Sequence, residues 1–206
     1  DFPLDSKWAD ISISLEFNGP QPNAFNVKPA TAKALGDIRE GSSVNFDNIT
    51  LTPHCNGTHT ECVGHITKER IYVRDCLQDV LIMAVLISAE PETSVDDGNK
   101  LITSSALIKA GIQSAAEDND ALIIRTLPND EEKLSRVYDD ENIPPYFSSD
   151  AMKYIVECGY KHLLVDLPSI DRLVDEGKLT NHRIFWNVEE GSFGTNSQTR
   201  INSTIT

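Results

Sequence analysis

The stretch SDAMKYIVECGYKHLLVD, residues 149–166, gives the clearest indication of the fold class. Its Ser-Asp start suits a helix N-terminus, and we expect a helix over residues 149–158 that Gly159 ends. The apolar run that follows predicts a strand over residues 161–166. A helix that leads directly into a strand is typical of an α/β fold.

The segments before this stretch continue the alternation of strands and helices. ALIIRT (residues 121–126) and VLIMAVLI (residues 80–87) predict strands, and the second is long enough to be buried on both faces. Helical spacing of apolar residues predicts a helix over residues 103–116, with Ser104 or Ser105 as its cap. We therefore expect an α/β domain, with parallel or antiparallel pairing of the strands left open.

The first quarter of the chain predicts two more strands. Residues 11–15 alternate apolar and polar side chains, as a half-buried strand does, and the Asn-Gly-Pro at residues 18–20 predicts a loop. Apolar positions over residues 44–51 predict a second strand. The sequence shows no internal repeat, so a single domain over residues 1–206 is expected.

Composition excludes several kinds of partner. The net charge of −14 repels nucleic acid and anionic lipid, so we expect neither a nucleic-acid nor a membrane partner. No apolar stretch approaches the roughly 18 residues of a membrane helix. The four cysteines form no C-x-x-C pair, which indicates reduced thiols in a cytoplasmic protein.

PHCNGTHTECVGH, residues 53–65, holds three of the five histidines of the chain. His59 and Glu61 are two apart, so on a strand both side chains leave the same face and can bind one cation. His65 can return to that ion if the chain turns at Gly64. Nitrogen and oxygen donors in this mixture suit Zn²⁺ or Mn²⁺ better than Ca²⁺ or Mg²⁺.

This run resembles the H-x-G-T-H-x-D-x-P-x-H motif of the cyclase family. These are metal-dependent hydrolases that include kynurenine formamidase (arylformamidase) and isatin hydrolase. Residues 57–59 match the G-T-H, and Glu61 and His65 fall at the Asp and the last His of the motif.

A second segment, further along the chain, resembles the same family. VDLPSID (residues 165–171) is similar to its D-T-P-S-I-D segment, and His182 falls where the family has another metal-site histidine. Residues 121–126 resemble the strand that precedes its R-T-G turn. The resemblance covers about residues 9–205.

Two departures concern metal ligands. Glu61 occupies the position where the family motif has Asp, and its extra methylene moves the carboxylate outward. The first histidine of the motif should lie four residues before His59, where this chain has Cys55, with His54 one residue further back. Strand alternation places Cys55 on the face of His59, whereas His54 would need a bulge. Thiolate is also a zinc ligand, so both residues remain candidates.

A third departure concerns the end of the sequence. The family supplies a late Glu ligand after the downstream histidine, and Glu189 and Glu190 follow His182. Residues 200–206, however, read like the strand that leads into that Glu. We therefore expect a domain truncated at its C-terminus, with one ligand beyond Thr206.

The resemblance implies a swivelling β/β/α fold, with a central mixed sheet or barrel and flanking helices. It also implies hydrolysis of a small amide: an aryl formamide such as N-formylkynurenine, or a cyclic amide. One or two ions would polarise the scissile carbonyl and lower the pKa of water to about 7. A homo-oligomer and a small, aromatic amide substrate are expected on the same ground.

The resemblance also implies roles for individual residues. His59, Glu61 and His182 would hold metal, while His65 would bind a second ion or act as the base, so that Glu61 and His65 are the expected catalytic residues. A second group is expected outside the metal shell: Thr58 as an orienting hydrogen-bond partner, Asp166 as a supporting carboxylate or a turn or helix cap, Asp171 as a helix cap, and His162 as a structural residue.

A rival hypothesis is a metal-binding or ligand-binding protein that keeps this fold without turnover. It is favoured by the Glu61 replacement, the displaced first histidine and the missing late Glu.

Overall fold

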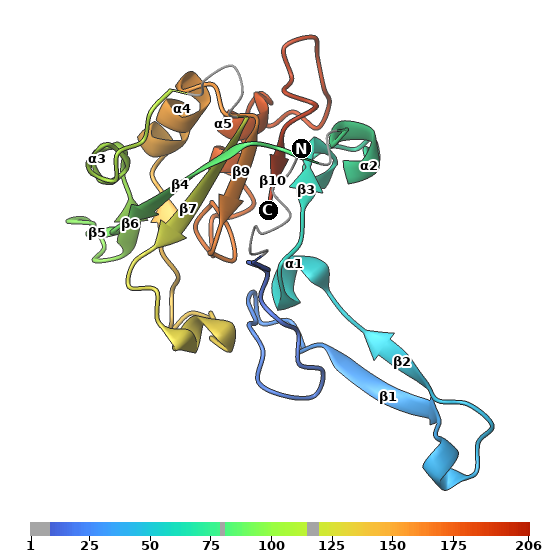
Figure 1. Ribbon diagram of the computed structural model, residues 1–206. Helices are drawn as coiled ribbons and strands as arrows, with labels where there is room; N and C mark the ends of the chain where they lie inside the picture. The colour runs from blue at the N-terminus through green and yellow to red at the C-terminus, as the bar shows by residue number, and fades with distance from the viewer. Residues whose placement is uncertain (1–8, 79–80, 115–119) are drawn as a thin grey trace, which may run out of the picture.

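The computed structural model describes residues 9–78, 81–114 and 120–206, and its largest sheet has five strands in the order β3-β10-β9-β7-β4 (Figure 1). The last four of these run parallel, and β3 is antiparallel to β10. The expected α/β class is confirmed, and the pairing that the sequence left open is mixed. The strands are β3 Glu61–Cys62, β4 Ala84–Ala89, β7 Ala121–Thr126, β9 His162–Val165 and β10 Thr204–Ile205.

Three helices cover one face of this sheet: α3 Ser104–Lys109, α4 Ser149–Glu157 and α5 Thr180–Trp186. α4 packs against both of the others, and all three contribute to one core with the central strands. The indole of Trp186 is fully buried, and its N–H donates to the carbonyl of Ser203 at 2.9 Å. The fully buried apolar side chains include Leu107, Leu122, Met152, Ile155, Leu163, Phe185 and Trp186.

The opposite face of the sheet is much more open. Leu86 on β4 pairs with Ile123 on β7, which pairs with Leu164 on β9. Leu86 is 59% exposed, although it belongs to an apolar strand. The prediction that the run 80–87 is buried on both faces is therefore wrong: β4 begins at Ala84 and is an edge strand, and position 80 lies outside the described residues.

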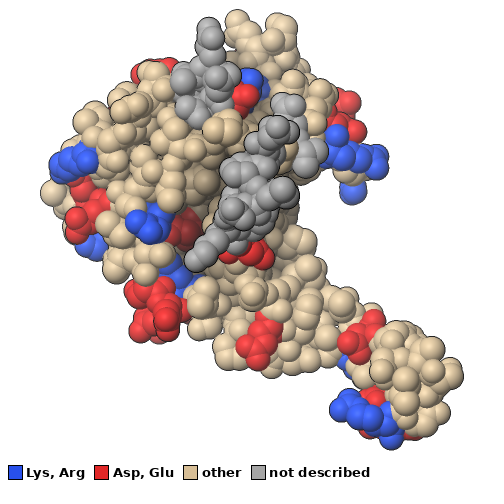
Figure 2. Space-filling model, viewed as in Figure 1, with Lys and Arg blue, Asp and Glu red and all other residues tan. Residues whose placement is uncertain are grey.

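A two-stranded arm extends away from this body (Figures 1 and 2). It consists of β1 Thr31–Gly36 and β2 Phe46–Thr50, which pair antiparallel. The second strand predicted in the first quarter is confirmed as β2, but every residue in it is exposed. An isolated two-stranded hairpin is at best marginally stable in water.

The remaining elements are short. A three-stranded sheet has the order β5-β6-β8, with β6 parallel to β8. Its strands are β5 Glu92–Thr93, β6 Lys100–Ile102 and β8 Tyr146–Phe147. Two one-turn helices, α1 Pro53–Asn56 and α2 Val73–Cys76, and three 3₁₀ turns, Ile38–Glu40, Val63–His65 and Glu131–Leu134, complete the described elements.

Two predicted elements differ from the structure. Residues 11–15 form no strand; the N–H of Ile13 donates to the hydroxyl of Thr58 instead of to a neighbouring strand. The helix expected over residues 103–116 is shorter, because α3 ends at Lys109 and residues 115–116 lie outside the described part. Its cap is Thr103, not Ser104 or Ser105.

The decisive stretch at residues 149–166 folds as expected. α4 ends just before Gly159, which has a φ of 92°, a left-handed conformation that glycine adopts without strain. Its cap is Ser148, one residue earlier than predicted. β7 and β9 confirm the strands predicted at residues 121–126 and 161–166. None of the described helices is long and apolar enough to cross a membrane.

Adjacent residues of α3 provide a test of this packing. Leu107 is fully buried and Ile108 is 59% exposed, yet both are aliphatic side chains of equal size on one helix. We expect Leu107→Ala to lower the free energy of unfolding by about 2–5 kcal/mol, and Ile108→Ala by less than about 1 kcal/mol. Urea denaturation of both variants measures this, and equal losses would contradict the assignment of the core.

Candidate metal centre

The motif at residues 53–65 folds as two turns joined by an extended segment. His54 lies on α1, Glu61 begins β3, and His65 ends the 3₁₀ turn that follows. Gly64 allows this turn, because a Cβ there would lie 2.0 Å from the carbonyl oxygen of Ile71. The turn expected at Gly64 is thus confirmed, whereas the strand assumed for residues before Glu61 is wrong.

The carboxylate of Glu61 is the centre of the cluster. Its Oε2 lies 3.2 Å from Nδ1 of His54 and 3.6 Å from Nδ1 of His65. Its Oε1 lies 3.0 Å from Nε2 of His182. Glu61 is buried, while His54 and His65 are exposed at the rim. The site therefore has a buried anionic floor and an imidazole rim open to solvent.

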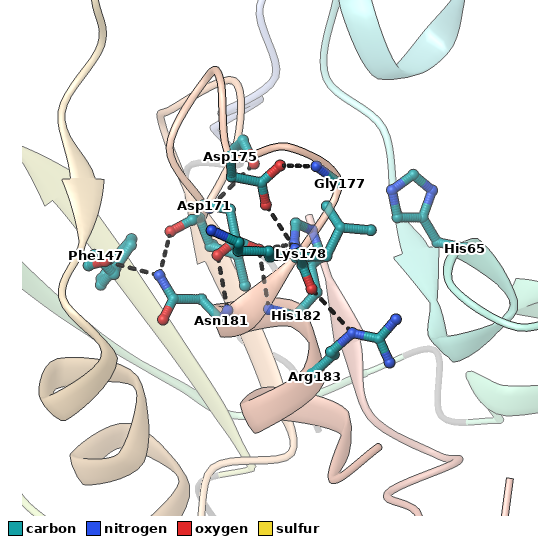
Figure 3. A network of polar contacts seen from close by, with 12 residues as sticks. His65, Phe147, Asp171, Asp175, Gly177, Lys178, Asn181, His182 and Arg183 are labelled. Atoms are coloured by element: carbon teal, nitrogen blue, oxygen red, sulfur yellow. Dashed lines mark hydrogen bonds and ion pairs between the residues drawn. The ribbon is translucent and has the colours of Figure 1, made fainter. Parts of the chain in front are cut away.

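His182 is positioned by a second carboxylate, Asp171 (Figure 3). Nδ1 of His182 lies 2.6 Å from Oδ2 of Asp171, and both side chains are about 5% exposed. The same carboxylate accepts the backbone N–H groups of Asn181 and His182, at the start of α5. Asp171 therefore caps this helix, as expected, and also fixes the direction of the imidazole toward Glu61.

The electrostatics of the cluster follow from burial and from these contacts. Burial opposes the charge of His182, but its bonds to Asp171 and Glu61 raise its pKa to about 9. Burial would raise the pKa of Glu61, yet hydrogen bonds from His182 and His54 outweigh it and hold that pKa well below the ordinary value. The side chain of His65 is 29% exposed, and its partial burial lowers its pKa, against the charge of Glu61. Glu61 is therefore ionised at neutral pH, and His65 is neutral.

The donor set fits a divalent transition-metal ion. One donor atom from each of His54, Glu61 and His65 lies within 4.8 Å of the others. A carboxylate with imidazole nitrogens is a typical ligand set for Zn²⁺ or Mn²⁺. His182 suits the same site, because a carboxylate that holds the second ring nitrogen is the usual support of a metal-binding histidine. These residues border a cavity of about 260 Å³.

The two candidates for the first ligand lie in different surroundings. Nδ1 of His54 contacts Glu61, whereas Cys55 is outside the three-residue donor group and borders a second, neighbouring cavity. The alternation argument for Cys55 fails because residues 53–56 form α1 and not a strand. His59 adjoins the cluster: its Nε2 lies 3.0 Å from Nδ1 of His54, and its Nδ1 lies 2.9 Å from the carbonyl of Gly57.

Other predicted residues take different places. Thr58 is exposed, and its hydroxyl binds the N–H of Ile13. Asp166 accepts the N–H of Thr126 and forms a 2.8 Å ion pair with Lys133, so it neither caps a helix nor holds a histidine in these contacts.

Two further expectations concern His162 and the late acids. His162 is buried beside the hydroxyl of Thr204, in keeping with a structural role. Glu189 and Glu190 are exposed and lie outside the three-residue donor group. The prediction that a late ligand follows Thr206 stays a prediction.

Sequence comparison identifies the family. Residues 9–172 match the Cyclase family model, described as "Putative cyclase". Kynurenine formamidase of Bacillus anthracis is 25% identical over 181 residues, which are 87% of this chain and 78% of the relative. Kynurenine formamidase of Bacillus cereus is 24% identical over 184 residues, with the same coverage. These named relatives are enzymes, and the prediction of an enzyme is confirmed.

Solved structures share the fold. A predicted metal-dependent hydrolase from Bacillus stearothermophilus superposes with a TM-score of 0.57 at 18% identity, over 96% of this chain and 79% of its own. Isatin hydrolase A from Labrenzia aggregata gives a TM-score of 0.59 at 12% identity, over 96% of this chain and 78% of its own. The resemblance predicted from two short motifs is thus found over most of the chain, which belongs to the Cyclase family.

Proposed function

We propose that this chain is a metal-dependent hydrolase of small aryl amides. The observation that carries the proposal is the buried carboxylate of Glu61 with imidazoles on both of its oxygens. Burial of an anion is unfavourable unless cations or donors offset it, and this arrangement offers a ready site for a divalent ion. Zn²⁺ and Mn²⁺ both suit the donors, as one or two ions per subunit.

The residues divide the work of amide hydrolysis. A divalent ion held there supplies a Lewis acid, which polarises the carbonyl and lowers the pKa of water. Glu61, His54, His59 and His182 are the proposed ligands. His65 is a candidate for a further metal ligand or for the base that moves the proton. Its place in the three-donor group favours the role of ligand. The C–N bond of the amide breaks, and the hydroxyl of water joins the acyl carbon. The remaining proton of that water ends on the amine nitrogen.

The substrate class rests on the relatives. Proteins named kynurenine formamidase and isatin hydrolase share the family or the fold of this chain. An aryl formamide, such as N-formylkynurenine, or a cyclic aryl amide is therefore the proposed substrate. We propose a cytoplasmic location because all four cysteines are free thiols.

Association with further copies of the chain is also proposed. The arm of β1 and β2 leaves Leu35, Phe46 and Ile49 more than half exposed. Apolar side chains on an unsupported hairpin would be covered by a second copy in a homo-oligomer.

Removal of the central carboxylate tests the metal site. We expect Glu61→Gln to abolish stoichiometric binding of Zn²⁺ or Mn²⁺ and hydrolysis of formanilide, because the amide carries no charge. Glu61→Asp should keep at least part of both activities, since the carboxylate remains. Metal content by elemental analysis and formanilide turnover measure the two effects.

Glu69→Gln is the matched control, because Glu69 lies on the surface close to the motif. It should bind metal and turn over substrate as the wild type does. A Glu61→Gln variant that still binds one full equivalent of metal would contradict the proposal. A wild type that binds metal but hydrolyses no formamide or cyclic amide would favour the non-catalytic rival.

Asp171 can be tested as a positioning residue. Asp171→Asn keeps the shape but loses the charge that holds His182, so metal affinity should fall about 10–100-fold. Its capping role predicts a separate loss of about 1 kcal/mol in stability. Asp37→Asn is the control, because Asp37 also accepts an N–H at the start of a short helical turn, Ile38–Glu40, and does not border the cavity of the metal centre. A loss of stability with unchanged metal affinity would show that Asp171 is only a cap.

A further inference from the structure

A second cavity, of about 430 Å³, adjoins the metal centre. His54 and His59 line both cavities, so the two meet at this imidazole pair. The second cavity reaches the sheet face that the helices leave open, where Leu86 and Ile123 line it. Its volume falls within the range of about 300–1,000 Å³ found for small-molecule sites.

The floor of the second cavity suits a flat ring. Leu86, Ile123 and Leu164 lie side by side on β4, β7 and β9, in register across the sheet. Neighbouring strands are about 4.8 Å apart, so the row extends for roughly 10 Å. An aromatic ring can lie on such a row with one face covered by aliphatic carbon.

The two cavities carry opposite charge among their described lining residues. The charged residues of the first cavity are Glu61, Asp171 and Asp175, against Arg172 and His182, whose raised pKa keeps it protonated at neutral pH. Those of the second cavity are Arg125 and Lys133, against Asp166. In a chain with a net charge of −14, a positive lining is unusual. The first cavity therefore favours a cation, and the second favours an anion.

Arg125 supplies the unbalanced positive charge. Lys133 is paired with Asp166 at 2.8 Å, whereas no carboxylate of the described residues forms an ion pair with Arg125. Its Nε and Nη2 donate to the hydroxyl of Ser88, at 2.9 and 2.7 Å. A guanidinium has five N–H donors, so three stay available in a group that Ser88 already orients.

The position of Arg125 complements the apolar floor. It follows Ile123 by two residues on β7, so both side chains leave the same face about 7 Å apart. Asn23, which is 6% exposed, also lines this cavity, and its Nδ2 has no acceptor among the described residues. A ring on the floor would thus carry its anionic group toward a fixed cation, with a further amide donor in the same cavity.

We infer that the second cavity binds an aromatic ring bearing a carboxylate, and that Arg125 binds this carboxylate. The ring lies on the row of Leu86, Ile123 and Leu164, and the amide extends past His54 and His59 to Glu61. This inference rests on the proposed function and narrows it: the substrates are anionic aryl amides, and Arg125 determines their selection.

Direct binding tests the inference apart from turnover. The probes are 2-aminobenzoate and aniline, which share the ring and the amino group, so that only 2-aminobenzoate carries the carboxylate. We expect wild type to bind 2-aminobenzoate the more tightly, both metal-loaded and after chelation. Arg125→Gln should weaken this binding about tenfold, and Arg125→Lys should restore most of it. Binding after chelation excludes a contact between carboxylate and metal.

Arg74→Gln is the matched control, because the Arg74 side chain is 80% exposed and lines neither cavity. It should bind both probes as the wild type does. Equal weakening of both probes by Arg125→Gln, or no weakening of either, would overturn the inference.

Turnover separates the two proposals. Metal-loaded wild type should have a higher kcat/KM for 2-formamidobenzoate than for formanilide, and Arg125→Gln should reduce this preference through KM. Hydrolysis of both compounds without a preference would overturn the inference and leave the proposed function standing. Hydrolysis of neither, with charge-selective binding intact, would overturn the proposed function alone.

Discussion

The burial of one carboxylate determines how this protein is organised. Glu61 is 8% exposed, and an ionised carboxylate at such a position is tolerated only when donors or cations surround it. Both of its oxygens face imidazoles, which come from α1, from the turn after β3 and from α5. His54 and His65 lie within one short motif with Glu61, but His182 is 121 residues away in the sequence. The complete cluster therefore requires the sheet and α5 to be in place.

The fold brings these segments together at one edge of the sheet. β3, which begins with Glu61, pairs with β10, and β10 pairs with β9. The segment after β9 carries Asp171, which caps α5 and holds His182. The carboxylate of Asp171 therefore links the segment after β9 to the start of α5 and fixes the direction of the His182 imidazole. The open face of the same sheet supplies a second, oppositely charged cavity beside the cluster.

The sequence predicted those parts that depend on local pattern. The strands at residues 121–126 and 161–166 and the helix between Ser148 and Gly159 follow from apolar runs and caps. The alternation at residues 11–15 was misleading, because alternation predicts exposure on one side but cannot provide a partner strand. The exposed Leu86 was likewise unpredictable, since the position of β4 at the sheet edge depends on distant pairings.

The candidate site also combines features that follow from local sequence pattern with features that depend on the fold. The spacing of His59, Glu61 and His65 indicated a metal site, and the resemblance added His182. The sequence leaves both His54 and Cys55 open, because their placement depends on a helical turn in a segment whose pattern predicts a strand. Asp171 was recognised as a cap, but its contact with His182 spans eleven residues and no local pattern encodes it.

X-ray absorption at the zinc edge of the zinc-loaded protein tests the central claim most directly, because it identifies the atoms around the ion. The structure predicts a shell of nitrogen and oxygen at about 2.0–2.1 Å with the outer scattering of imidazole rings, and no sulfur. A sulfur neighbour at about 2.3 Å would place Cys55 or another thiolate on the metal. That result would contradict a centre built on Glu61 and its histidines.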